Sequence, residues 1–140
     1  MPHRFPGLSL IGPLALAVLC LASTALAIDP ALLESEPTVY SRVVETPDPA
    51  LMGCFTRVRP SEFKRPNTYA FCLVKKGDKY AVYYDWKDGK TLEWHQGWMP
   101  FSIMKDRIVS DTEPSTYLLK DGELWHNYGG REAMHRMRRD

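Results

Sequence analysis

The sequence lacks most of the features that mark a particular chemistry. Its 140 residues contain no Cys-x-x-Cys pair, no glycine-rich phosphate loop and no Gly-x-Ser-x-Gly motif. These absences argue against a thiol oxidoreductase, a nucleotide-binding enzyme and an α/β-hydrolase. Excess charge is also lacking: 18 Lys and Arg stand against 17 Asp and Glu, a net charge of +1. We therefore expect neither a nucleic-acid-binding surface nor a strongly charge-driven role at a membrane surface.

Long apolar runs are rare as well, and the one present lies near the start. Leu8–Leu21 is almost wholly apolar, follows the basic residues His3 and Arg4, and precedes Ala25-Leu26-Ala27. This three-part pattern predicts a secretory signal peptide over residues 1–27 with cleavage before Ile28. No later run is long enough to span a bilayer. We therefore expect an exported protein, periplasmic or extracellular, with no stable membrane insertion after cleavage.

Two other interpretations of the leader remain open. The first is an uncleaved membrane anchor, against which Gly12, Pro13 and the small-residue site weigh. The second is a lipid anchor on Cys20, against which Leu19 weighs, because a small residue is expected before a lipidated cysteine.

Only Cys54 and Cys72 remain after the predicted cleavage. Two cysteines in an exported domain are most simply one disulfide, here joining two strand-like runs, Leu51–Arg59 and Thr68–Lys75. On the chain-entropy model such a bridge stabilises the fold by ~3 kcal/mol. The alternative, a redox-active pair, is disfavoured because such cysteines are usually closely spaced.

The chain divides into a leader, a lead-in and one domain. Residues 28–50 contain Pro30, Pro37, Pro47 and Pro49, which break regular structure, and five acidic residues against one Arg. We interpret them as an extended acidic lead-in with one edge strand at Thr38–Glu45. Residues 51–140 form the single β-domain.

The stretch from Gly77 to Trp98 carries the clearest fold signal. Period-two alternation predicts a strand at Tyr80–Trp86 with Tyr80, Val82, Tyr84 and Trp86 on one face. Asp88-Gly89 then predicts a two-residue hairpin turn. Lys-Asp-Gly recurs at residues 120–122, again before Trp-His, which indicates a second hairpin in an equivalent setting.

Turn signals every eight to twelve residues predict an all-β fold, a small antiparallel up-and-down meander. We expect it to close into a barrel of about eight strands, because closure removes exposed strand edges. The segment Arg131–Asp140 fits either a strand or a helix, and we favour a strand. The predicted strands that precede this segment are Leu51–Arg59, Tyr69–Lys75, Tyr80–Trp86, Thr91–Gln96, Phe101–Met104, Arg107–Val109, Thr116–Lys120 and Glu123–Tyr128.

This pattern resembles the small up-and-down barrels of the lipocalin and avidin type. Exported bacterial lysozyme inhibitors, short barrels with a disulfide, are similar in the same loose way. The Gly-x-Trp expected in the first strand of a lipocalin is replaced by Gly53-Cys54-Phe55. The resemblance covers the pattern of strands and implies a fold, and we assign no family from it.

Aromatic side chains are the candidate binding residues for a small apolar or aromatic molecule or for a protein. They line a ligand cup if the barrel is hollow and fill the core if it is narrow. Trp98 is expected in a loop as an exposed anchor, and Phe63 in the basic loop Pro60–Asn67 is a second loop anchor. The candidate residues are Tyr80, Tyr84, Trp86, Trp94, Trp98 and Trp125.

Metal and catalytic sites are not expected. His95, His126 and His135 supply enough ligands for zinc, but no pair has ligand spacing. Carboxylate pairs occur at Asp85/Asp88, Asp111/Glu113 and Asp121/Glu123, and most of these sit at turns, which Asp commonly supports. No cofactor, no metal and no catalytic residue are therefore predicted.

The resulting hypothesis is an exported, non-catalytic binding protein whose partner is a small-molecule ligand or an envelope protein. The alternative is an inhibitor or immunity-type protein that blocks a cell-envelope enzyme, such as a lysozyme-like hydrolase. A carrier needs a hollow barrel, whereas an inhibitor needs a filled one with loop anchors. A third reading, a hydrolase, needs a cleft that unites residues far apart in the sequence.

Overall fold

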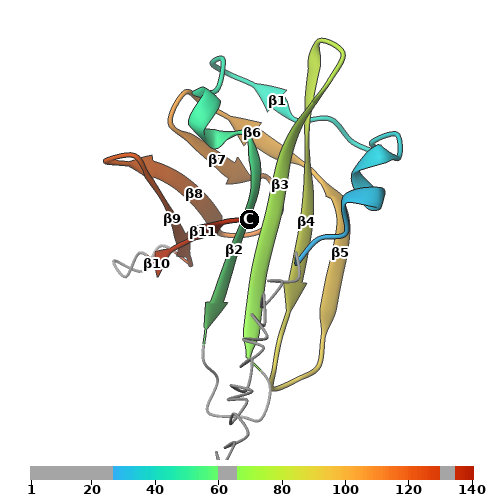
Figure 1. The fold of residues 1–140 in the computed structure, drawn as a ribbon, viewed down its shortest axis with the longest axis vertical. Helices are drawn as coiled ribbons and strands as arrows, with labels where there is room; N and C mark the ends of the chain where they lie inside the picture. Colours follow the sequence, from blue (N-terminus) through green and yellow to red (C-terminus); the bar gives the residue numbers. More distant parts are fainter. Residues whose placement is uncertain (1–26, 60–65, 130–134) are drawn as a thin grey trace, which may run out of the picture.

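A computed structural model describes residues 27–59, 66–129 and 135–140 (Figure 1). The predicted signal peptide lies outside these residues except for Ala27. The described chain is all-β, as predicted, with two short 3-10 helices, η1 (Pro30–Glu34) and η2 (Pro49–Leu51). The strands are β1 (Arg42–Val43), β2 (Gly53–Arg59), β3 (Asn67–Lys76), β4 (Lys79–Lys87), β5 (Trp94–Met99), β6 (Phe101–Ile103), β7 (Arg107–Ser110), β8 (Ser115–Lys120), β9 (Glu123–Tyr128), β10 (His135–Arg136) and β11 (Arg138–Arg139).

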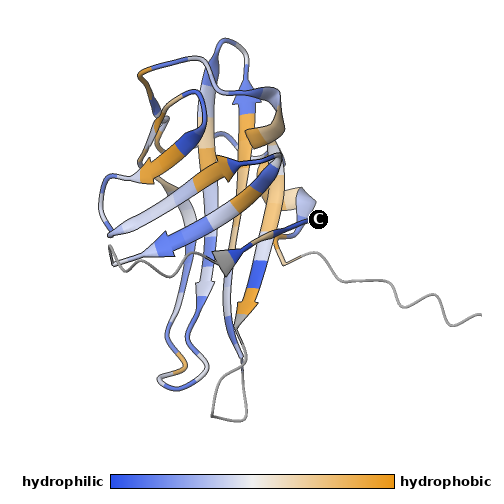
Figure 2. Cartoon of the chain, turned by 90° about the vertical axis from the view of Figure 1, so that its left-hand side faces the viewer, coloured by the Kyte–Doolittle hydropathy of each residue, from blue (hydrophilic) through white to orange (hydrophobic). Residues whose placement is uncertain are grey.

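The strands form two sheets. The long sheet has the order β11-β2-β3-β4-β5, and the short sheet has the order β1-β6-β7-β8-β9-β10. All pairs are antiparallel except β1–β6, which is parallel. Strands of the short sheet cross those of the long sheet obliquely, and the lower ends of β3 to β5 extend past the short sheet (Figure 2).

The predicted closed barrel is not found. Within the described residues, no strand of one sheet pairs with a strand of the other. Instead the chain steps between sheets over a single residue, at Pro100 between β5 and β6 and at Met137 between β10 and β11. Pro100 has no backbone N–H to continue a ladder, so the hydrogen bonding is interrupted where the chain changes sheet.

Both sheets bury one face in a shared core. The four residues expected on one face of β4 do pack there together, which confirms the alternation: Tyr80, Val82, Tyr84 and Trp86. The centre is occupied by Phe71, Phe101 and Tyr117, whose side chains are fully buried or nearly so. The Phe71 and Tyr117 rings lie 4.4 Å apart. Side chains therefore fill the space between the sheets.

Two tyrosine hydroxyls end inside this core. The Oη atoms of Tyr84 and Tyr117 are buried, and neither makes a hydrogen bond of good geometry in the part of the chain that the structure describes. Burial raises the pKa of both phenols far above the ordinary value. These two side chains therefore act as neutral, space-filling rings.

Residues 28–33 pack onto the outer face of the long sheet. Ile28 is buried against Ala70, Cys72 and Tyr83, and residues of η1 lie beside it. Strand β1 falls inside the range predicted for an edge strand. The lead-in therefore supplies a cover for the sheet as well as an edge strand.

The predicted disulfide is confirmed. Cys54 of β2 and Cys72 of β3 lie directly opposite each other, with 4.1 Å between their Cα atoms. The bridge therefore links two neighbouring strands of the long sheet.

The two Lys-Asp-Gly sequences form different turns. Asp121 and Gly122 have φ angles of 52° and 76° and join β8 to β9 in the predicted two-residue hairpin. Asp88 and Gly89 do not, and the two-residue turn predicted there is wrong. The chain runs in a six-residue loop, residues 88–93, that is closed by the bond from Asp88 N to Glu93 O at 2.9 Å.

Candidate functional site

The six aromatic candidates do not share one surface. Tyr84 lies in the core, with Tyr80 and Trp86 packed at its margin. Trp125 contributes to a separate small hollow on the short sheet. Trp98 is not in an exposed loop as predicted. It lies in β5, half-buried, with its ring 5.1 Å from that of Tyr83 and its Nε1 donating to Ser35 Oγ at 3.3 Å.

Trp94 is the exposed member of the set, and it borders a groove at the end of the long sheet. The groove has a volume of about 360 Å³ and lies between the start of β3 and the β4–β5 loop. We call it the tip groove. Its lining residues are Pro66, Thr68, Lys87, Asp88, Gly89, Leu92, Glu93 and Trp94.

Large apolar side chains are displayed at this end of the sheet. Trp94 is 58% exposed, Leu92 60% and Val58 55%. Val58, Thr68, Lys87 and Trp94 stand opposite one another across β2, β3, β4 and β5, so they share the outer face. Exposed apolar side chains that gather in one place mark an interaction site more often than scattered ones do.

Leu92 also has an unusual backbone. Its φ angle is 64°, in the left-handed region that bulky side chains rarely adopt. Such a conformation costs of order 1 kcal/mol, and the leucine gains no burial in return. Strain of this kind, held in an exposed apolar residue, is typical of functional loops.

The loop that carries Leu92 is nevertheless ordered by hydrogen bonds. Asp88 Oδ1 accepts from the backbone N–H groups of Lys90 at 2.7 Å and Thr91 at 3.1 Å, which holds the pKa of Asp88 below its usual range. Gly89 N donates to Asn67 Oδ1 at 2.7 Å and ties the loop to β3. Ordering of this kind lowers the entropy that is lost when a loop binds.

The indole of Trp94 is fixed from both sides. Its Nε1 donates to Asp85 Oδ1 at 3.2 Å, and the Lys87 ammonium lies 4.7 Å from the ring centroid. The Asp85 side chain is only 3% exposed, and its Oδ1 lies 4.0 Å from Lys87 Nζ. Burial raises the pKa of Asp85, although Lys87 and the Trp94 N–H act in the opposite direction.

This burial gives a testable pH dependence. Because the folded-state pKa of Asp85 lies above its ordinary value of 3.8, the stability that the protonated form contributes is complete below pH 3.8. That stability is lost as pH rises through the folded pKa. Asp85→Asn keeps an acceptor for Trp94 and does not titrate. We expect urea unfolding to show wild type losing stability relative to Asp85→Asn as the pH rises from 3.8 through the folded-state pKa. Parallel pH profiles for the two proteins would contradict the assignment.

A buried Ser–His contact lies elsewhere, between the sheets. Ser115 Oγ is 2.7 Å from His126 Nε2, and Arg57 Nη1 is 2.9 Å from His126 Nδ1. An arginine only donates, so Nδ1 must accept and the proton of the neutral ring sits on Nε2. Nε2–H therefore donates to Ser115, and this imidazole has no free lone pair with which to activate the hydroxyl. The contact is a structural network and lacks the arrangement of an activated serine.

Two of the three candidate zinc ligands have other contacts in the structure. Both ring nitrogens of His126 are engaged, as described above. His95 stacks on Trp86 with ring centroids 5.0 Å apart. His135 stands opposite His126 in the register of β10 and β9. Among the described residues, no group of three or more His, Cys, Asp or Glu is placed to hold a metal ion.

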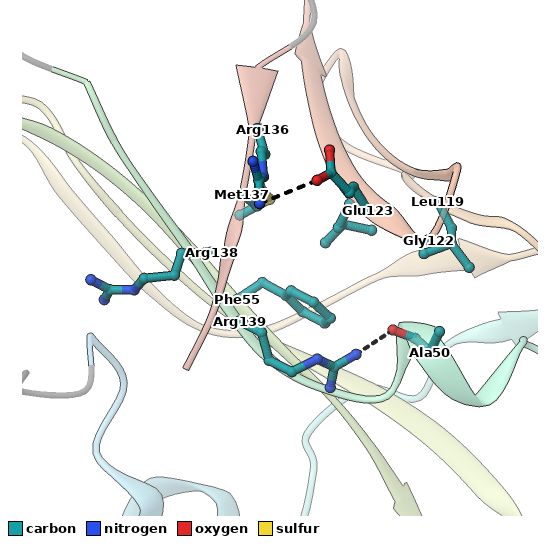
Figure 3. Close-up of a pocket in the computed structure, with 10 residues that line it drawn as sticks. Ala50, Phe55, Leu119, Gly122, Glu123, Arg136, Met137, Arg138 and Arg139 are labelled. Carbon is teal, nitrogen blue, oxygen red and sulfur yellow. Dashed lines mark hydrogen bonds and ion pairs between the residues drawn. The ribbon is translucent and has the colours of Figure 1, made fainter.

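A second concavity lies where the chain crosses at Met137. This C-terminal pocket has a volume of about 450 Å³ and combines apolar core-edge residues with arginines of the last strands (Figure 3). Its lining residues are Ala50, Phe55, Leu119, Gly122, Glu123, Leu124, Arg136, Met137, Arg138 and Arg139.

The described chain thus defines a class of protein, a disulfide-bridged all-β fold of two sheets with a filled core. It contains no helix whose length and hydropathy suit a membrane span. Comparisons of the sequence with protein families and with curated proteins, and of the fold with solved structures, find no significant match.

Proposed function

We propose that this is an exported, non-catalytic binding protein that recognises another protein through the tip groove. Export is supported by the leader pattern of residues 1–27 and by the Cys54–Cys72 disulfide. The observation that carries the binding site is the ordered loop that holds Leu92 and Trp94 exposed at the end of the sheet.

The filled core favours a protein partner over a cargo carried inside the fold. A carrier encloses its ligand, but the centre between the sheets is occupied by Phe71, Phe101 and Tyr117. A fixed tryptophan beside an apolar groove is the usual anchor of a protein interface. The partner surface that fits is an apolar side chain bordered by mixed charge, because Lys87, Asp88 and Glu93 surround the groove. If the protein is an inhibitor, the partner that carries this surface is an envelope enzyme.

The first step of the test is crosslinking in the native host. A photoreactive phenylalanine derivative at position 92 should crosslink to one envelope protein. The same group at position 44 should not, because Val44 is also exposed but lies beside β1, at the other end of the long sheet (Figure 1).

The second step measures affinity for the identified protein. Leu92→Asn suits a positive φ and removes the apolar side chain, so it should weaken binding at least tenfold without lowering the free energy of unfolding. Trp94→Ala should weaken binding at least as much. Val44→Ser should leave affinity unchanged. The proposal fails if Leu92→Asn binds as tightly as wild type. An activity assay of the partner then distinguishes an inhibitor, which lowers that activity, from a protein that binds without affecting it.

A further inference from the structure

We propose that the C-terminal pocket binds a small amphipathic anion, an aliphatic or aromatic carboxylate. This site is built from other elements than the tip groove and does not depend on the proposed function. Its base consists of apolar side chains from both sheets at the open end of the core: Phe55, Leu119, Leu124 and Met137. A ligand chain placed there continues the packing of the core.

Two guanidinium groups, those of Arg139 and Arg136, border this apolar base. Arg139 lies with its Cζ 4.5 Å from the Phe55 ring centroid, and it donates to Met52 O at 2.8 Å and to Ala50 O at 2.5 Å. These contacts fix a positive charge beside the apolar surface. Figure 3 shows Arg138 pointing away from the pocket, and its Nη2 donates to Asp140 Oδ1 at 3.2 Å. Arg138 therefore contributes little to the charge inside.

Arg136 is the cation that an incoming anion meets. Its Nη2 lies 3.2 Å from Glu123 Oε1, and its side chain is 67% exposed. A guanidinium has five N–H donors, so one ion pair leaves others for a carboxylate of the ligand. Among the lining residues that the structure describes, Glu123 is the one acid, and it competes with the ligand for Arg136. The pocket thus pairs an apolar base with a net positive rim, which matches a carboxylate with an apolar tail.

The experiment titrates octanoate into the ¹⁵N-labelled protein and follows backbone amide shifts. We expect saturable shifts at residues 122–124 and 136–139. 1-Octanol, which has the same chain without the charge, should bind at least tenfold more weakly. Butyrate, which has the charge on a shorter chain, should also bind more weakly than octanoate, because less apolar surface is buried.

Three variants separate the charge from the shape of the pocket. Arg136→Gln should weaken octanoate binding about tenfold, and Glu123→Gln should strengthen it severalfold by removing the competing carboxylate. Arg107→Gln removes an arginine from β7, outside the pocket, and should change nothing. Equal affinity for octanoate and 1-octanol, or equal effects of Arg136→Gln and Arg107→Gln, would overturn the proposal, as would shifts confined to residues outside the pocket.

Discussion

Replacing His126 with leucine should destabilise the fold by about 3 kcal/mol, measured by urea unfolding at neutral pH. Leucine has a similar size, so the loss comes from hydrogen bonding. The Arg57 guanidinium, which is almost wholly buried, loses the Nδ1 acceptor at 2.9 Å. Ser115 loses the Nε2–H donor at 2.7 Å. A hydrogen bond to a charged group contributes about 1.5–3 kcal/mol.

His126→Asn provides the matched control. The asparagine amide oxygen retains an acceptor for Arg57 but leaves a void where the ring stacked on Tyr117 at 4.6 Å. If the buried guanidinium dominates, asparagine should cost about half as much as leucine. If packing dominates, the order is reversed, because the void is larger with asparagine. Leucine tolerated better than asparagine would therefore contradict the role assigned to the His126–Arg57 contact.

Removing the disulfide by changing Cys54 and Cys72 to alanine should cost about 3 kcal/mol at 25 °C. The two cysteines are 18 residues apart. Opening a loop of this length returns conformational entropy to the unfolded chain, and Tm should fall by roughly 10 °C. Thermal and urea unfolding both measure the effect.

Reduction provides the control for that double variant. Wild type treated with a thiol reductant should unfold at the same urea concentration as the alanine variant, because both lack the same covalent constraint. The oxidised protein should unfold at a clearly higher concentration. Superimposed curves for oxidised wild type and the alanine variant would show that the bridge adds nothing to stability.

The period-two alternation of apolar and polar residues predicted the strands well, and there is a physical reason why it did not predict how the sheets are arranged. The face formed by Tyr80, Val82, Tyr84 and Trp86 is correct because period-two burial is a local property of a strand. Barrel closure was wrong because it depends on pairing between strand edges, which hydrophobic pattern does not encode. Whether the sheets close into a barrel is decided at Pro100 and Met137, the single residues at which the chain crosses from one sheet to the other.

The two Lys-Asp-Gly sequences show the same limit at a turn. Both contain the residues of a two-residue hairpin, yet only Asp121-Gly122 forms one. At Asp88-Gly89, the Asp88 carboxylate caps Lys90 and Thr91, and Asn67 of the neighbouring strand binds Gly89. The Asn67 contact is tertiary, so the sequence around the turn does not reveal it.

The candidate site was only partly visible in the sequence. Trp94 was among the expected binding residues, but nothing marked Leu92 apart from its place near a turn. Its exposure follows from the longer loop, and its positive φ is a property of the folded backbone. Asp85 of β4 and Trp94 of β5 lie on one face of paired strands and are joined by a hydrogen bond. Predicting this contact from the sequence requires both the period-two alternation and the correct register of the two strands.

The pairing of β11 with β2 has a consequence for the order of folding. The hydrogen bond between Thr56 and Asp140 spans 84 residues, whereas β2 to β5 join through neighbouring hairpins. During synthesis, those four strands can assemble before residues 138 and 139 have been made, so that one edge of β2 is still unpaired. An unpaired edge is open to wrong strands from other molecules. A delay in translation between residues 99 and 138 therefore lengthens the interval in which this edge is open to aggregation.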